Sequence, residues 1–238
     1  MNRKTLLVVG AHSADFVWRA AGSIALVTSQ SGSAFVIALS YGERGESGEL
    51  WQEPGQSVDN VKRIRHAEAS AAAAVVGASF RCLDLGDYPL RVDDLALQQL
   101  VEIFQEIQPN LLFTHTPVDP FNPDHPVAYQ AVQKARLLAT GAGVASGFKQ
   151  ITPPDLLLFE PHQPELSEFM PNVLVDITPF IDLKIKAMEA MAAQKYLQEY
   201  YTDLASRRGN HARRISGMKE VRYAEAFQRT LPWVVKSL

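Results

Sequence analysis

The segment "VVGAHSADFVWRAAG", residues 8–22, combines the end of an apolar run, a short polar turn and the start of an amphipathic run. Residues 6–10 are apolar or small, which is typical of a buried strand. Residues 16–30 have the periodicity of a helix. His12 and Asp15 lie in the turn between these two runs. A strand followed closely by a helix predicts the first unit of an α/β fold.

The same alternation of short apolar runs and helical segments continues along the chain. The further predicted strands cover residues 34–40, 80–90, 110–116, 155–161 and 172–178. The further predicted helices cover residues 61–77, 95–109, 127–140, 181–205 and 218–228. This order predicts a Rossmann-like, mostly parallel sheet with helices on both faces. Because no internal repeat, low-complexity tract or linker interrupts the pattern, we expect a single domain over residues 1–238.

The composition restricts the class of protein. The 238 residues are 47% hydrophobic, with 23 basic and 26 acidic side chains, so nucleic acid is not an expected partner. The single cysteine, Cys82, excludes a disulfide framework and a CxxC zinc cluster. No run approaches the ~20 apolar residues that span a bilayer, and the apolar start is too short for a signal peptide. We therefore expect a cytoplasmic protein without a membrane partner.

Polar side chains follow several of the predicted strands. In an open α/β sheet, ligands bind outside the carboxyl ends of the strands. The residues expected at this edge are His12, Asp15, Glu43, Arg44, Glu46, Asp84, Asp87, His115, Asp119, Asp124, His125 and His162. Two imidazoles and one carboxylate suit a divalent ion such as zinc, and they leave a coordination position open for water or substrate.

A histidine and an aspartate three residues apart are a weak signal when they occur alone, because a histidine after a strand is usually a turn or surface residue. The signal becomes more specific when a second pair lies in a loop after a later strand. The segment "NPDHP", residues 122–126, supplies that pair as Asp124 and His125. The two segments together predict a metal site.

Three segments resemble the PIG-L (LmbE-like) family of zinc-dependent N-deacetylases: "VVGAHSADF", "RIRHAEASAAAAVVGA" and "DPFNPDHPVAY". The resemblance covers about residues 5–140. It implies a PIG-L-like α/β fold and one divalent ion, Zn²⁺, bound by His12, Asp15 and His125. It also implies that Arg65, in the family's helix motif, binds substrate.

Two positions depart from the deacetylase pattern. The aspartate that serves as general base in the family is replaced by Ala14, which cannot take up a proton. The histidine that stabilises the oxyanion in the family is replaced by Asn122, which can donate a hydrogen bond but carries no titratable proton. Loss of an acid–base group typically lowers the rate by about 10²–10⁴-fold. The sequence therefore argues against an efficient deacetylase.

The chain also resembles one branch of this family, the 4-oxalomesaconate hydratases of gallate and protocatechuate degradation. The matching segments run along nearly the whole chain: "AHSADFVWRAAG", "SYGERGESGELW", "DLGDYPLR", "DPFNPDHP", "FEPHQPE" and "EYYTDLASRRG". The resemblance implies a hydro-lyase that uses the zinc site to add water to a C=C bond. Its substrate would be 4-oxalomesaconate or a similar unsaturated keto or enol polycarboxylate.

Such a substrate requires positive charge and hydrogen-bond donors around it. Arg44 lies in the loop after the second predicted strand, and Arg65 lies on the helix that follows. We expect these two arginines and Asn122 to bind the small anionic carboxylate substrate.

A hydratase also needs a group that transfers the proton at carbon. Glu46 in "GERGES" and His162 in "EPHQPE" are the leading candidates, because Ala14 has removed the usual base. Asp124 either orients His125 or carries a proton, and the sequence does not separate these two roles.

Two other functions remain open on the sequence. The chain could be a zinc-dependent deacetylase of an N-acetyl sugar in which Glu46 or Asp124 replaces the lost base. It could also be a metal-binding homologue without catalytic activity. We further expect a homo-oligomer, with the basic segment "RRGNHARR", residues 207–214, as a candidate interface.

Overall fold

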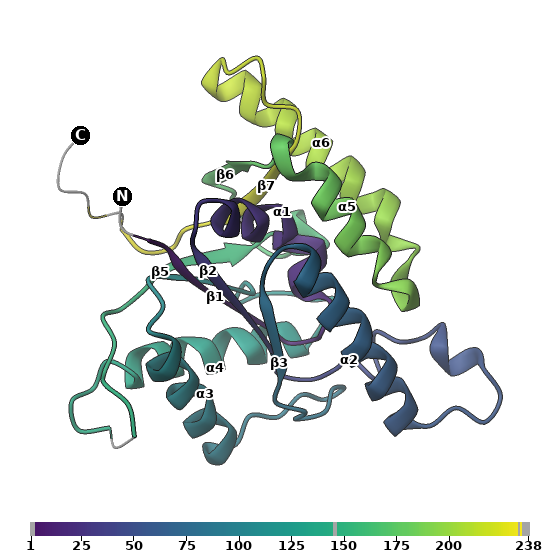
Figure 1. Cartoon of the computed structure of the whole chain (residues 1–238), viewed down its shortest axis with the longest axis vertical. Coiled ribbons are helices and arrows are strands. Elements are labelled where there is room, and N and C mark those ends of the chain that lie inside the picture. Colours follow the sequence, from purple (N-terminus) through teal and green to yellow (C-terminus); the bar gives the residue numbers. More distant parts are fainter. Residues whose placement is uncertain (1–2, 145–146, 233, 235–238) are drawn as a thin grey trace.

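A seven-stranded sheet runs through the computed structural model, which describes residues 3–144, 147–232 and 234. The strand order is β3-β2-β1-β4-β5-β7-β6 (Figure 1). The strands are β1 (Thr5–Gly10), β2 (Ser33–Ala38), β3 (Ser79–Cys82), β4 (Leu111–Thr114), β5 (Asp155–Phe159), β6 (Val173–Asp176) and β7 (Ala224–Gln228). Strands β1 to β5 pair in parallel, and β7 is antiparallel to both β5 and β6. This is the mostly parallel α/β architecture that the sequence predicts.

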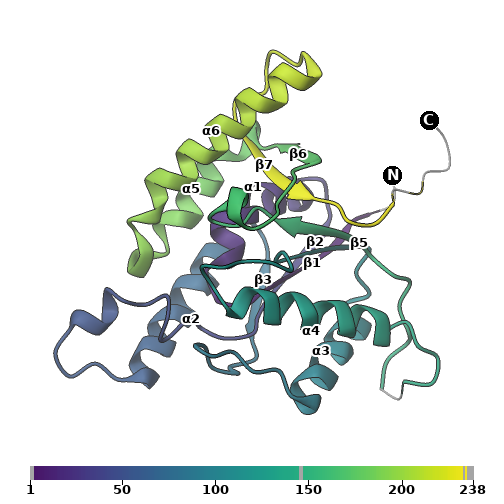
Figure 2. The same cartoon turned by 180° about the vertical axis from the view of Figure 1, so that it is seen from behind.

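Helices cover both faces of the sheet, and Figure 2 shows the second view of this arrangement. The helices are α1 (Asp15–Ser29), α2 (Val58–Val75), α3 (Asp94–Ile107), α4 (Asp124–Leu138), α5 (Ile181–Glu189) and α6 (Leu197–Ser216). Short 3₁₀ segments span Leu50–Gln52, Pro164–Leu166, Thr178–Phe180 and Ala192–Gln194. Helices α1, α2, α5 and α6 pack on one face, and α3 and α4 pack on the other.

Strand β1 lies at the centre and contributes to both hydrophobic cores. Leu6 and Val8 pack against the face that carries α1, whereas Leu7 and Val9 pack against α3 and α4. This division follows from the two-residue period of a strand. A strand that is apolar on both faces is buried on both, as the composition of residues 6–10 predicts.

The parallel pairing determines where the turns after the strands lie. Val8 of β1 lies opposite Phe113 of β4, so the residues after these two strands emerge side by side. His12 and His115 therefore reach the same edge of the sheet although they are far apart in sequence. This edge carries the candidate site.

The C-terminal part differs from the sequence prediction in two respects. Residues 218–228 were expected to be helical, but Ala224–Gln228 forms β7, inserted between β5 and β6. A run of five residues is too short for periodicity to separate a strand from a helix. The helix expected over residues 181–205 is two helices, α5 and α6, separated by a 3₁₀ turn. Neither glycine nor proline marks this break, and Met191, which lies in it, is completely buried.

The predicted strand over residues 80–90 is also shorter than expected and ends at Cys82. Residues 83–93 instead form a loop at the carboxyl edge of the sheet. Within the described residues, no helix has the length and apolar character needed to cross a membrane.

Candidate metal centre and its cavity

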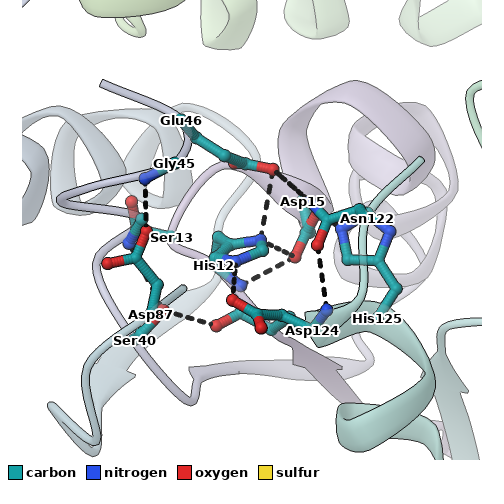
Figure 3. Close-up of polar contacts among 12 residues, drawn as sticks. His12, Ser13, Asp15, Ser40, Gly45, Glu46, Asp87, Asn122, Asp124 and His125 are labelled. Carbon is teal, nitrogen blue, oxygen red and sulfur yellow. Dashed lines mark hydrogen bonds and ion pairs between the residues drawn. The ribbon is translucent and has the colours of Figure 1, made fainter. Parts of the chain in front are cut away.

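Four side chains converge at the carboxyl edge of β1 and β4: His12, Asp15, Glu46 and His125 (Figure 3). Each offers one ligand atom, and these atoms all lie within 4.8 Å of one another. His12 and Asp15 come from the turn between β1 and α1, and Glu46 comes from the loop after β2. His125 lies in the first turn of α4.

The turn after β1 is built closely around Asp15. The backbone N–H of His12 donates a hydrogen bond of 2.8 Å to Oδ2 of Asp15. A Cβ atom at position 10 would lie 2.9 Å from Cβ of Asp15, a distance that real Cβ atoms essentially never show. Gly10 therefore allows the carboxylate to fold back over the end of the strand, and this places Asp15 next to His12.

The His12 ring is held through one of its nitrogen atoms. Nε2 lies 3.3 Å from Oδ2 of Asp124. The Asp124 carboxylate is itself fixed, because it accepts hydrogen bonds from the backbone N–H groups of Tyr88 (2.9 Å) and Leu90 (2.8 Å). Nδ1 of His12 lies 3.1 Å from Oε1 of Glu46.

The His125 ring is held in the same manner by a different carboxylate. Nδ1 of His125 lies 2.7 Å from Oδ2 of Asp119. Nε2 of His125 lies 3.5 Å from Oδ1 of Asp15. Asp119 therefore orients His125, whereas Asp124 contacts His12.

The remaining nitrogen atoms of the two rings make this a suitable site for a metal ion. Nδ1 of His12 and Nε2 of His125 are buried and face carboxylate oxygens of Glu46 (3.1 Å) and Asp15 (3.5 Å). Neither nitrogen makes a hydrogen bond of regular geometry within the described part of the chain. Histidines that bind metals typically use one ring nitrogen as ligand and donate the other to a carboxylate or carbonyl. With Asp15 and Glu46 they form a nitrogen and oxygen donor set of the kind that binds zinc. The residues present fit a divalent ion.

The electrostatics of the site also favour a bound cation. Burial would lower the pKa of His12, but Glu46, Asp124 and Asp15 together raise it well above its ordinary value. Burial would raise the pKa of Asp15, but His115 and His125 hold it well below its ordinary value. The site thus concentrates ionised carboxylates around two imidazoles, and a bound cation would balance this negative charge.

His115 stacks on His125, with ring centroids 4.0 Å apart and planes inclined by 14°. Its Nε2 lies 3.0 Å from the backbone nitrogen of Ala11 and 3.0 Å from Oδ2 of Asp15. Burial, together with the neighbouring His125, lowers the pKa of His115 to about 3. His115 thus contacts Asp15 and stacks on His125.

A cavity of about 280 Å³ opens beside the four ligand residues. This volume is near the lower end of the range for small-molecule sites, about 300–1,000 Å³. Besides Asp15, Glu46 and His125, the walls are formed by Trp18, Arg19, Gly45, Tyr88, Asp119, Phe121, Asn122, His162, Gln194, Tyr196, Leu197 and Tyr201. Ligand residues and aromatic walls thus face one space.

The structure brings most of the predicted site residues to this cavity. Glu46, Asn122 and His162 line it, and Nδ2 of Asn122 donates a hydrogen bond of 3.2 Å to Oε1 of Glu46. Asp124 lies behind His12, where it accepts backbone hydrogen bonds.

The two arginines predicted to bind substrate lie elsewhere. Arg44 is half-exposed in a separate groove, where Nη1 lies 3.2 Å from Glu43 and 3.7 Å from Asp87. Arg65 is fully buried, and its nitrogen atoms donate to Glu68 and Gln194. Arg65 thus does not line the cavity itself, but it holds Gln194, which does.

Sequence reasoning gave no role to Arg19, Asp119 or Tyr201. Arg19 follows Asp15 by four residues in α1, so helical spacing alone places both on one face of that helix. Asp119 was expected at the sheet edge, but its pairing with His125 depends on the shape of the 116–123 loop. Tyr201 comes from α6, and no local pattern connects it with β1.

The fold and the site together define a class: an α/β protein with a candidate metal centre of two histidines and two carboxylates at the carboxyl edge of its sheet. The family model of PIG-L, described as GlcNAc-PI de-N-acetylase, matches residues 7–136. The chain belongs to the PIG-L family.

Individual relatives refine this assignment. The 4-oxalmesaconate hydratase of Pseudomonas putida is 44% identical over 239 residues, which cover 99% of this chain and 93% of the relative. The crystal structure of GalB, the 4-carboxy-2-hydroxymuconate hydratase of P. putida, matches with a TM-score of 0.95 and 44% identity, covering 99% of each chain. The N,N'-diacetylchitobiose deacetylase of Pyrococcus horikoshii shares the fold, with a TM-score of 0.79 and 20% identity over 95% of this chain and 84% of that one.

Proposed function

We propose that this chain is a metal-dependent hydratase that adds water to the C=C bond of 4-oxalomesaconate or a similar unsaturated keto or enol polycarboxylate, as a step of gallate or protocatechuate degradation. The similarity to a hydratase at 44% identity over 99% of the chain carries this proposal. Ala14 agrees with it, because the position of the deacetylase base holds a side chain that cannot take up a proton.

The proposed cofactor is one Zn²⁺ ion held by His12, Asp15 and His125, with the Glu46 carboxylate next to it. A divalent ion at such a site acts as a Lewis acid that polarises a carbonyl oxygen or lowers the pKa of water. The fit of the donor set supports this choice, since two imidazoles and carboxylate oxygens are common ligands of catalytic zinc.

Glu46 is proposed as the group that takes a proton from the attacking water. Burial would raise the pKa of Glu46, but His12 lowers it below its ordinary value, so the side chain is ionised near neutral pH. The hydrogen bond from Asn122 and the approach of His12 both fix Oε1 at the edge of the cavity. An ionised, positioned carboxylate of this kind can act as a general base.

His162 is proposed as the group that gives a proton to carbon. It lines the same cavity, in the loop that follows β5, and its ring lies against that of Tyr200, with centroids 4.5 Å apart and planes inclined by 35°. The hydroxyl group of Tyr200 donates a hydrogen bond of 2.8 Å to the backbone oxygen of His162 and fixes this loop. Hydration then places OH on one carbon and H on the other, so that one water molecule is consumed. Glu46 afterwards releases its proton to the solvent and His162 takes one up.

The test compares two reactions on the purified, metal-loaded protein. We expect the ultraviolet absorbance of 4-oxalomesaconate to decay with time, and no acetate to be released from N-acetylglucosamine derivatives. The variant His125→Ala, which lacks one proposed ligand, should show neither reaction. Acetate release without hydration would refute the proposed function in favour of a deacetylase. Stoichiometric metal without either reaction would favour a binding protein.

The proposal also includes the setting of the enzyme. We propose a cytoplasmic homo-oligomer with a small anionic carboxylate as its substrate. The end of α6 supports self-association, because Ile215 and Met218 are exposed next to the basic residues of this helix. Light scattering coupled to size-exclusion chromatography measures the oligomeric state directly.

A further inference from the structure

Arg19 occupies an unusual position in α1, one turn after the proposed ligand Asp15. The side chain is almost completely buried, yet it lines the cavity beside the candidate metal centre. Its Nη1 donates a hydrogen bond of 3.1 Å to the hydroxyl oxygen of Tyr201. Its Nε lies 3.8 Å from Oδ1 of Asp15 and has no hydrogen-bond partner within the described part of the chain. A buried guanidinium with an unused donor is costly unless a ligand completes it.

The backbone around Arg19 is braced by a buried ion pair. Nζ of Lys184 lies 2.7 Å from Oε1 of Glu225 and donates a 2.7 Å hydrogen bond to the carbonyl oxygen of Trp18. The Glu225 carboxylate accepts hydrogen bonds from the N–H groups of Gly22 (3.0 Å) and Ser23 (2.8 Å). In a regular helix the N–H of Gly22 donates to the carbonyl of Trp18. The ion pair therefore supplies hydrogen-bond partners to backbone N–H and C=O groups in this turn of α1. These contacts fix the backbone on either side of Arg19.

Aromatic side chains surround the same part of the cavity. The Trp18 and Tyr201 rings stack with centroids 5.6 Å apart, and the His162 ring lies 6.2 Å from Tyr201. The Tyr201 oxygen already accepts the hydrogen bond from Arg19, so its own hydrogen is free to be donated elsewhere. Arg19 and Tyr201 thus place two donors at a cavity that has both aromatic and polar walls.

No other lysine or arginine lines the cavity among the residues that the structure describes. Arg44 and Arg65 are paired with carboxylates outside it. A polycarboxylate that enters this space would meet positive charge in two places, at the metal centre and at Arg19.

We propose that Arg19, with the Tyr201 hydroxyl as second donor, forms the subsite that binds a substrate carboxylate remote from the reacting carbons. This assignment rests on the proposed function, which supplies a substrate with several carboxylates. The subsite selects for polycarboxylates, because a neutral group at this position would leave the guanidinium unpaired.

A purely structural role for Arg19 is the competing explanation. In that case the guanidinium would only balance the charge of Asp15, and its removal would weaken the metal site. The two explanations differ in one property: only a subsite distinguishes a ligand carboxylate from an uncharged group of the same shape.

The experiment therefore measures that difference with an unreactive pair of ligands. Glutarate and its monoamide have the same length and differ in one carboxylate. Their binding is measured by titration calorimetry on the metal-loaded parent and on Arg19→Gln, together with the metal content of each protein. Arg63→Gln is the matched control, because Arg63 is an exposed arginine of α2. Arg19→Lys tests whether the forked geometry matters in addition to the charge.

We expect the parent and Arg63→Gln to bind glutarate about 10–100-fold more tightly than the monoamide, as for a charge-assisted hydrogen bond. Arg19→Gln should bind the two equally with unchanged metal content, and Arg19→Lys should lie between. The proposed subsite would be refuted if Arg19→Gln still bound glutarate more tightly than the monoamide, or if the parent bound the two ligands equally. Loss of metal in Arg19→Gln with both ligands weakened alike would overturn it in favour of the structural role. A parent that discriminates but does not hydrate 4-oxalomesaconate would refute the proposed function and leave the subsite standing.

Discussion

Ala14 lies between two residues of the candidate metal centre and is itself completely buried. It precedes α1, and its backbone oxygen accepts a hydrogen bond of 2.9 Å from the N–H of Val17. A carboxylate introduced here would add a buried negative charge next to Asp15, beside the site that we propose binds a polyanion. Two like charges about 4 Å apart repel by about 4 kcal/mol at an effective dielectric constant of about 20.

We therefore expect Ala14→Asp to reduce hydration sharply, mainly through weaker substrate binding, while the bound metal is retained. Steady-state kinetics and elemental analysis measure the two quantities. Ala14→Asn is the control, since asparagine has nearly the same shape without the charge. Equal activity of Ala14→Asp and the parent would contradict the placement of the substrate near His12.

His162 gives a prediction about pH. Burial and the nearby Arg19 lower the pKa of His162 below its ordinary value near 6.5. A proton donor is active only when protonated, so kcat/KM should fall as the pH rises through this lowered pKa of the free enzyme. A bound polyanion favours the protonated ring, so the same decline in kcat should occur at a higher pH. Both profiles are measured between pH 5 and 8.5, in buffers of constant ionic strength.

His162→Asn should lower kcat and remove this pH-dependent decline, with metal content unchanged. Glu46→Gln serves as the comparison, since it should lower kcat but keep the decline that belongs to His162. An unaltered pH profile in His162→Asn would assign the proton transfer to another group.

At the scale of the elements, the first half of the fold could be predicted because its signals are local. Residues 6–10 are apolar on both faces of a strand, and the adjacent turn carries His12 and Asp15. Parallel pairing then brings the turn after β1 beside the residue that follows β4. Glu46 could be expected near this edge only as part of a loop, and its approach to His12 depends on the folded path of that loop.

The parts that could not be predicted depend on tertiary contacts. The "AEAFQ" segment that forms β7 has too few residues for a clear period, and its Glu225 binds backbone groups of α1. Arg65 was predicted to bind substrate, but its Nη2 donates a hydrogen bond of 2.6 Å to Oε1 of Gln194, which is 129 residues later in the chain. Such side-chain pairings select among orientations that local sequence leaves equally available.

Helix α6 supplies a prediction about packing. A Cβ atom at Gly209 would lie 2.0 Å from the carbonyl oxygen of Arg222, so the helix and the chain before β7 are in close backbone contact. Gly209→Ala should destabilise the protein by about 1–3 kcal/mol through overpacking, although alanine favours a helix by up to about 1 kcal/mol. Urea unfolding measures the change. Ser206→Ala, at an exposed position on the same helix, should change stability by less than about 0.5 kcal/mol. A gain in stability for Gly209→Ala would contradict the close contact.

At the scale of the whole molecule, the candidate metal centre joins segments that are distant in sequence. His12 and Asp15 follow β1, Glu46 lies in the loop after β2, and His125 begins α4. Asp119 and Asp124 add further buried negative charge behind the two rings. Without a cation, the folded state keeps these charges close together, whereas the unfolded chain separates them.

Metal removal should therefore lower the stability of the folded chain. An ion that binds only the folded state at 100 times its dissociation constant stabilises it by about 2.7 kcal/mol. For a chain of this size, that corresponds to about 5–10 °C in Tm. We expect a chelator to lower Tm by about this amount and added Zn²⁺, but not Mg²⁺, to restore it, because nitrogen ligands favour zinc. The double variant His12→Ala/His125→Ala should bind no metal, and its Tm should not respond to the chelator. An unchanged Tm in parent protein shown by elemental analysis to have lost its metal would mean that the four side chains hold their arrangement without an ion.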